Sequence, residues 1–391
     1  MNSINKTLWG GVWLSFVTGI AAAITVTKAS PALLDIQKEL PLSVIQIGWI
    51  MSSAALATVF LGIFVGSLSR KHGPKMLLQL ALGLIIVTAG FSLFISSANE
   101  LIISRVVEGI AVILVSVAAP TLVAHLSKPS DLGLTMGLWA LWMPVGSVLA
   151  FLLSPFILEQ YGWRWLWGSS AFLALPLLLL TIKLHDPTRL IAATVNEKLS
   201  RSVIYRAVIM GTIFTCFTAC FFSMVTYLPT YLIDTYHVSS SRALLITTVL
   251  PAFIIPGNLL SGFLIHRGVS SFQMMSYPAA VLALIVTILL HAHYPAEVGL
   301  FLLALVGFFL GMIPTAIFAL SPRLADKPID TGRIIGIVIT GQGPGILLAP
   351  PLAGFLIGEL HQWQNLYPLY LTLTVGIIVL TQCLKTLQAR N

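Results

Sequence analysis

The sequence has 391 residues, of which 57% are apolar and only 9% are charged, and its formal net charge is +8. An ordinary soluble domain is about a quarter charged, and a soluble chain of this size could not cover its surface with so few polar groups. The composition therefore excludes soluble, secreted and disordered proteins. It predicts an integral membrane protein whose surroundings are the lipid bilayer.

A helix needs about 20 apolar residues to cross a bilayer, and the sequence contains twelve such stretches. In chain order they are expected at residues 8–28, 45–67, 75–96, 100–124, 132–158, 164–184, 206–233, 242–265, 272–291, 296–321, 332–358 and 365–384. A polar stretch at 185–205 separates the first six from the last six. We therefore predict an all-α membrane protein of two six-helix bundles, residues 1–184 and 206–391, joined by a cytoplasmic linker.

The distribution of lysine and arginine predicts the orientation of the chain. With the N-terminus in the cytoplasm, sixteen of the 21 basic residues fall on the cytoplasmic side and four fall outside. This bias is the positive-inside pattern of inner-membrane proteins, so both termini are expected in the cytoplasm of a bacterium. Anionic lipid at that surface accounts for the positive charge, and no nucleic-acid partner is expected.

Short patterns recur in the two halves of the chain in the same order. Residues 31–35, Pro-Ala-Leu-Leu-Asp, follow the first stretch, and residues 229–234, Pro-Thr-Tyr-Leu-Ile-Asp, follow the seventh. Residues 66–73 and 262–268, which begin and end in glycine, follow the second and eighth stretches. The recurrence predicts a duplicated unit with pseudo-two-fold symmetry, an arrangement that places a transport site between the halves near the midplane.

Two segments of the chain resemble sequence patterns of the major facilitator superfamily. Residues 66–75 read Gly-Ser-Leu-Ser-Arg-Lys-His-Gly-Pro-Lys, against the family pattern Gly-x-Leu-x-Asp-Arg-x-Gly-Arg-Arg. Arg70 stands where the family has an aspartate that helps to hold the cytoplasmic face closed, so this latch is either lost or moved to other groups. Arg105 and Gly109 match the fourth-helix pattern Arg-x-x-x-Gly. The resemblance implies transport by alternating access, with a single chain as the functional unit.

A narrower resemblance comes from the fifth stretch. Residues 137–146, followed by Tyr-Gly-Trp-Arg at 161–164, are similar to bacterial permeases of the cyanate and nitroimidazole type. The Gly-Pro-x-x-Gly ending of drug exporters is incomplete here, because Ala150 and Phe151 occupy its last positions.

Among the ionisable residues inside predicted spans three are prominent, namely Lys28, Arg105 and Glu108, and each needs a physical reason. Lys28 and Arg105 are expected at similar depth in the outer half of the membrane, where two cations could bind an anionic solute. Alternatively, Lys28 could extend to the lipid headgroups, and Arg105 could simply neutralise Glu108, three residues away. A third hypothesis is that Glu108 takes up the coupling proton, which would free Arg105 for the solute.

Other residues are candidates by type and depth. We expect five further residues to line the solute cavity, namely Trp139, Trp142, Tyr227, Asn258 and Gln342. Tryptophans near span ends are typical of interfacial anchors, which we expect for Trp163, Trp165, Trp167 and Trp363. Small, basic and helix-breaking residues are candidates for gating, namely Gly66, Arg70, Gly73, Lys75, Gly109, Gly341, Gly343 and Pro344.

Motifs for hydrolysis, metal binding or nucleotide binding do not occur in the sequence, so we expect no enzyme activity, no cofactor and no metal. Without ATP, a gradient must drive any accumulation. The leading hypothesis is a secondary transporter of a small organic or inorganic anion, coupled to protons. The alternative hypotheses are proton-driven efflux of lipophilic drugs and a receptor that binds a solute without moving it.

Overall fold

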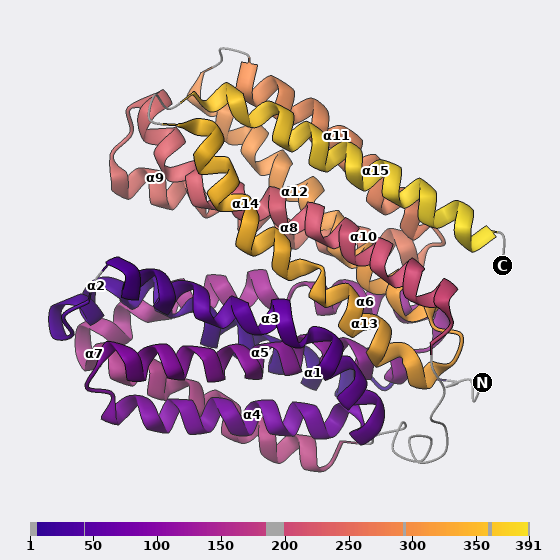
Figure 1. Ribbon diagram of the computed structural model, residues 1–391, viewed down its shortest axis with the longest axis horizontal. Helices are drawn as coiled ribbons and strands as arrows, with labels where there is room; N and C mark the ends of the chain where they lie inside the picture. Colours follow the sequence, from indigo (N-terminus) through magenta and orange to yellow (C-terminus); the bar gives the residue numbers. More distant parts are fainter. Residues whose placement is uncertain (1–5, 43, 185–198, 292–294, 359–361, 390–391) are drawn as a thin grey trace. The chain divides into compact units, whose positions relative to one another are not determined.

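The computed structural model describes residues 6–42, 44–184, 199–291, 295–358 and 362–389 (Figure 1). The described residues are helical and contain no strand, so the all-α prediction is confirmed. Eleven of the described segments are long and apolar enough to cross a membrane. The segment at 129–182 covers the fifth and sixth expected spans, which Gly162 divides because its backbone is not helical, with a positive φ of 77° and ψ 175° that favour glycine.

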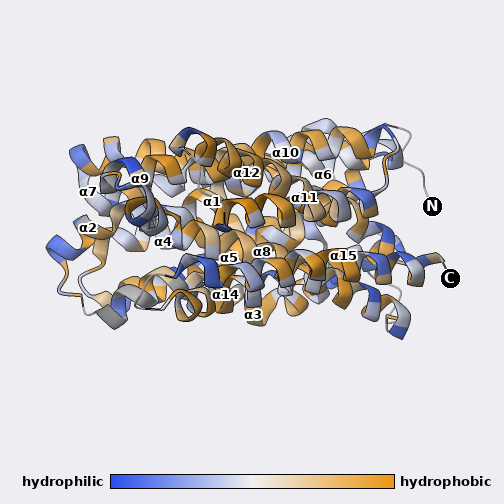
Figure 2. Ribbon diagram, turned by 90° about the horizontal axis from the view of Figure 1, so that it is seen from above, coloured by the Kyte–Doolittle hydropathy of each residue, from blue (hydrophilic) through white to orange (hydrophobic). Residues whose placement is uncertain are grey.

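Apolar side chains cover the outside of the helices as well as their packed faces. Figure 2 shows hydrophobic residues along the helices and hydrophilic residues gathered near helix ends. Large side chains such as Phe94, Phe172 and Phe355 are 80%, 74% and 82% exposed in the protein alone. A surface of this kind is stable only against lipid, which agrees with the prediction from composition.

The helices form two compact units, and each unit is described separately. The first unit contains seven helices among the described residues, α1 (Trp9–Thr27), α2 (Ala29–Glu39), α3 (Val44–His72), α4 (Pro74–Phe91), α5 (Ala98–Leu126), α7 (Trp142–Ile182) and α13 (Thr331–Thr340). Within it, α3 and α4 pack on α5, and α1 packs on α7.

The second unit repeats this pattern of packing. Its helices among the described residues are α6 (Leu132–Ala140), α8 (Arg201–Tyr236), α9 (Ser240–Thr247), α10 (Val249–His266), α11 (Ser271–His291), α12 (Ala296–Leu320), α14 (Gln342–Ile357) and α15 (Tyr367–Ala389). Helices α10 and α11 pack on α12, and α8 packs on α14. Most of the expected linker, residues 185–198, lies outside the described residues, and α8 already begins at Arg201 within the expected linker range.

Close helix contacts at glycine support the duplication. A side chain on Gly109 of α5 would collide with the carbonyl of Ala54 on α3. In the second unit, a side chain on Gly311 of α12 would collide with the carbonyl of Ile254 on α10. The second pair lies about 200 residues after the first, which is the repeat length expected from the sequence.

Two expected spans are broken into separate helices that belong to different units. Leu141 separates α6 from α7, and Gly341 separates α13 from α14. Consequently residues 132–140 pack with the second unit and residues 325–340 with the first, which the expected boundaries at 184 and 206 did not include. The physical reason is close packing at small residues, because Gly66 of α3 fits against Gly332 and Gly336 of α13.

Candidate functional site

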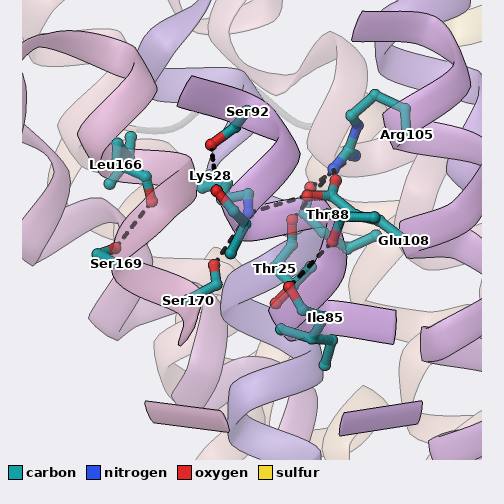
Figure 3. Close-up of polar contacts among 12 residues, drawn as sticks. Thr25, Lys28, Ile85, Thr88, Ser92, Arg105, Glu108, Leu166, Ser169 and Ser170 are labelled. Atoms are coloured by element: carbon teal, nitrogen blue, oxygen red, sulfur yellow. Dashed lines mark hydrogen bonds and ion pairs between the residues drawn. The ribbon is translucent and has the colours of Figure 1, made fainter. Parts of the chain in front are cut away.

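Three ionisable side chains meet inside the first unit, where Lys28 lies opposite Arg105 and Glu108 (Figure 3). Lys28 occupies the junction between α1 and α2, and the other two residues lie on one face of α5. Helix α5 begins at a capping box of Ser97 and Glu100, in which each side chain accepts from a backbone amide of the other. The capping box fixes the first turn of α5 and therefore the positions of Arg105 and Glu108 along the helix.

The three side chains form one buried ionic cluster. Lys28, Arg105 and Glu108 are 0%, 1% and 0% exposed. The Nζ atom of Lys28 lies 2.9 Å from Oε1 of Glu108, and Nη1 of Arg105 lies 2.5 Å from Oε2. Each carboxylate oxygen therefore faces its own cation. With all three groups ionised, the cluster carries one more positive charge than negative charges.

The remaining guanidinium donors of Arg105 bind backbone carbonyls. Nη1 and Nη2 donate to the carbonyls of Thr25 and Val26, at 3.0 Å and 2.9 Å, and Nε donates to the carbonyl of Ile50 at 3.1 Å. Thr25 and Val26 are in the last turn of α1, where carbonyls lack partners within the helix. Arg105 thus joins α5 to both α1 and α3.

Lys28 has two further neighbours on α7. Its Nζ donates to Oγ of Ser170 at 2.9 Å, and the same atom lies 4.9 Å from the centre of the Trp167 ring. Trp167 contacts Trp163 edge to face, with ring centres 5.8 Å apart. The cation is therefore held between a carboxylate, a hydroxyl and an aromatic face, all shielded from solvent.

These contacts exclude one of the alternatives for the charged residues and leave their role in binding a solute or a proton as a prediction. Extension of Lys28 to the lipid headgroups is excluded, because the side chain is buried and paired with Glu108. The expected Arg105–Glu108 pair is confirmed. However, it is only part of a larger cluster, because the carboxylate also binds Lys28.

The expectation of interfacial anchors was wrong for Trp163 and Trp167. Both side chains are 0% exposed and belong to the apolar core beside Lys28, whereas Trp165 between them is 49% exposed. Position near a span end does not indicate which face of a helix a residue occupies. Sequence reasoning also missed Ser170, although its spacing of three residues from Trp167 places both on one helix face.

Trp139 and Asn258 lie in the second unit, within packed helices. Trp139 of α6 is 0% exposed and contacts Phe318 edge to face, with ring centres 6.3 Å apart. Asn258 of α10 accepts from the Thr315 hydroxyl at 2.8 Å, and its amide donates to the carbonyl of Ala140 at 3.5 Å. In this structure the two side chains join α6, α10 and α12.

Tyr227, Gln342 and Trp142 occupy three different environments. Tyr227 of α8 lines a cavity of about 50 Å³ in the second unit, together with Tyr231 and Trp363. Gln342 begins α14, and its backbone carbonyl accepts from Thr218 at 3.1 Å. Trp142 begins α7 in the first unit and is 5% exposed. The expected lining residues are therefore divided between the two units.

The gating candidates at residues 66–75 lie at the end of α3 and the start of α4 and form specific contacts within the first unit. Arg70 of α3 pairs with Asp330 at 3.3 Å, so its acidic partner comes from the segment before α13. Gly73 has φ 83°, a conformation that favours glycine, and lets α4 begin at once after α3. Lys75 donates to the carbonyls of Ile182 and Leu184, at 2.9 Å and 2.8 Å.

The gating candidates Gly341, Gly343 and Pro344 lie at a break in the eleventh expected span, between α13 and α14. Gly341 lies against the backbone of Gly211 on α8, where a side chain would collide. Gly343 is buried, and Pro344 is in the first turn of α14, where a missing amide hydrogen costs nothing. The matching break at Leu141 was not expected, although Pro144 lies three residues after it just as Pro344 lies three residues after Gly341.

Comparison with known proteins agrees with this architecture. The family model for the Major Facilitator Superfamily matches residues 14–330. The D-xylose transporter of Levilactobacillus brevis is 30% identical over 196 residues, which are 50% of this chain and 41% of that protein. The arabinose-proton symporter of Escherichia coli K12 is 31% identical over 144 residues, which are 37% of this chain and 30% of that protein. The matches thus span less than half of these relatives.

Solved structures show the same fold over nearly the whole chain. A proton:xylose symporter gives a TM-score of 0.79 at 16% identity, covering 96% of this chain and 94% of the other. The E. coli fucose:proton symporter gives a TM-score of 0.77 at 17% identity, covering 97% of this chain and 99% of the other. The narrower resemblance to cyanate and nitroimidazole permeases stays a prediction. The helix pattern and the family match together show that the chain belongs to the Major Facilitator Superfamily.

Proposed function

We propose that this chain is a proton-coupled secondary transporter of a small polar solute of the sugar class. The observation that carries the proposal is the buried cluster of Lys28, Arg105 and Glu108. Its contacts connect α1, α3, α5 and α7, so a change of one proton alters bonds between several membrane helices at once. Buried ionisable groups in spans are typical of proton relays in transporters.

The contacts of the two cations favour a neutral solute over the anion expected from the sequence. Arg105 uses its guanidinium on three backbone carbonyls and Glu108, and Lys28 uses its ammonium on Glu108 and Ser170. An anion would have to displace these partners. Relatives with named solutes include a D-xylose transporter, an arabinose-proton symporter and a galactose-proton symporter, which supports sugar over both the anion and the lipophilic drug.

The proposal includes the placement of the chain. Both termini lie in the cytoplasm of a bacterium, in the orientation that the basic residues favour. One chain supplies both six-helix bundles and therefore a complete pathway. The coupled pair of substrates is one solute molecule and one or more protons.

Uptake into proteoliposomes tests this function. Purified protein in vesicles with an alkaline interior is given D-xylose, L-arabinose, D-galactose or L-fucose, and separately a panel of small carboxylates. We expect accumulation of at least one sugar above the outside concentration, abolished by a protonophore. Lys183→Met, which changes an exposed lysine outside the cluster, serves as the control variant. Accumulation of a carboxylate without any sugar would overturn the proposed solute.

A further inference from the structure

The buried cluster contains two cations and one carboxylate, and this imbalance restricts where an exchangeable proton can reside. The charged groups that face Lys28 are Arg105 and Glu108, both from α5. From α7 it meets the Ser170 hydroxyl and the Trp167 ring, which do not titrate in the physiological range. The uncompensated positive charge therefore has no further acidic partner among these contacts.

Arg105 cannot be the group that exchanges the proton. A guanidinium stays protonated in proteins, and this one is fixed by three backbone carbonyls and by Glu108. The choice is thus between a proton gained by Glu108 and a proton lost by Lys28.

The two choices have opposite effects on the buried charge. Protonation of Glu108 would leave two neighbouring cations without a counter-charge inside an apolar unit, the costly case of an unpaired buried charge. Loss of a proton from Lys28 would leave the Arg105–Glu108 pair, which is electrically neutral and held at 2.5 Å.

The hydrogen bonds of the cluster also survive loss of the proton from Lys28. A neutral amine keeps N–H donors beside Oε1 of Glu108, 2.9 Å away, and its free lone pair can accept from the Ser170 hydroxyl. A protonated Glu108, by contrast, would present a hydroxyl between two groups that can only donate. The local geometry therefore tolerates one of the two changes and opposes the other.

We propose that Lys28 carries the exchanged proton, and that Glu108 and Arg105 act as a fixed ion pair that positions it. In the exchange step, Nζ of Lys28 releases H⁺ to water and keeps the electron pair, and it takes up H⁺ from water on the return. Because Lys28 is buried in this structure, the exchange takes place in a conformation in which the surrounding helices have separated and admit water. The role of this proton in transport rests on the proposed function, whereas the charge change at Lys28 does not.

A first experiment needs no solute, because Trp167 reports on Lys28. An ammonium group above an indole ring changes the fluorescence emission of that tryptophan. Here Nζ of Lys28 lies 4.9 Å from the centre of the Trp167 ring. Tryptophan fluorescence of the full-length protein in detergent is measured across acidic to alkaline pH. We expect a one-proton step that is absent from Trp167→Phe, Lys28→Met and Lys28→Arg, and retained in Lys183→Met. A step that persists in Lys28→Met, or no step in the wild type, overturns the proposal.

A second experiment connects the proton to transport. In proteoliposomes with an alkaline interior, D-xylose accumulation by Lys28→Met should fall to equal concentrations on both sides, although the Glu108 carboxyl is still present. Accumulation at the wild-type level in Lys28→Met overturns Lys28 as the carrier and leaves the proposed function intact. If the wild type accumulates no sugar but the fluorescence step behaves as expected, the proposed function fails and the proton at Lys28 stands.

Discussion

Lys28 and Glu108 lie 80 positions apart in the sequence, yet their side chains meet at 2.9 Å in a site that solvent does not reach. The contact joins the end of α1 to the middle of the charged face of α5. Since Glu108 also holds Arg105, the stability of this region depends on one carboxylate that balances two cations.

Replacement of that carboxylate should strongly destabilise the protein. Removal of one partner of a buried ion pair costs about 3–5 kcal/mol, so Glu108→Gln is expected to lower the free energy of unfolding by that order. The added change Lys28→Met should recover part of the loss, because it removes one of the two unbalanced cations. Thermal unfolding in detergent measures both effects. Glu159→Gln, which changes an exposed carboxylate on α7, should have little effect.

Two adjacent serines on α7 provide a matched test of how Lys28 is held. Ser170 accepts from Lys28, whereas Ser169 donates to the carbonyl of Leu166 in its own helix (Figure 3). Hydrogen bonds to charged groups contribute about 1.5–3 kcal/mol, so Ser170→Ala should lower stability by that order and reduce proton-driven uptake. Ser169→Ala should change neither by a comparable amount. Equal effects of the two variants would show that Ser170 has no special role.

Glycine contacts between helices predict another pair of outcomes. Gly109→Ala and Gly311→Ala each introduce a methyl group into the backbone of a packed helix, at Ala54 and Ile254. Overpacking of this kind costs about 1–3 kcal/mol. Gly83→Ala on α4 meets nothing within 4 Å and should stabilise its helix by up to about 1 kcal/mol. The unfolding temperatures of Gly109→Ala and Gly311→Ala should lie below that of the wild type, and the unfolding temperature of Gly83→Ala should not. An unchanged unfolding temperature for Gly109→Ala would contradict the tight contact.

The pairing of Arg70 with Asp330 predicts a different response from an exposed ion pair. Both side chains are largely buried, at 12% and 10% exposure, and Asp330 also pairs with Arg333. Asp330→Asn should therefore lower the free energy of unfolding by about 1–3 kcal/mol. Asp35→Asn breaks a pair whose lysine is 74% exposed, and such pairs contribute about 1 kcal/mol or less. Denaturant unfolding of the two variants should separate them, and a larger loss in Asp35→Asn would refute this reading.

Much of the fold could be predicted from the sequence, because the membrane imposes a strong pattern on it. Apolar stretches, basic loops and the repeat near residues 66 and 262 indicate the helices and their duplication. The ionisable residues of the site could also be found, since a charge in an apolar stretch is conspicuous. Their common cluster could not, because hydropathy does not specify which helix faces meet.

Other features had no signal in hydropathy. Trp163 and Trp167 resemble interfacial anchors by position, and only packing shows that they are core residues. The break at Leu141 lies three residues before Pro144, which cannot donate a hydrogen bond to the carbonyl of Ala140, so its signal is proline spacing and not hydropathy. The residues expected to line the solute cavity also remain predictions. Trp142 belongs to the first unit, and the other four belong to the second.

The assignment of residues 325–340 to the first unit has a consequence for synthesis. When the ribosome has completed residue 199, the first bundle still lacks α13, and Gly66 has no glycine surface against which to pack. The N-terminal half therefore lacks this partner of α3 until more than a hundred further residues have been made. A fragment that ends at the linker would lack α13, so the contact of Gly66 with Gly332 and Gly336 could not form in it.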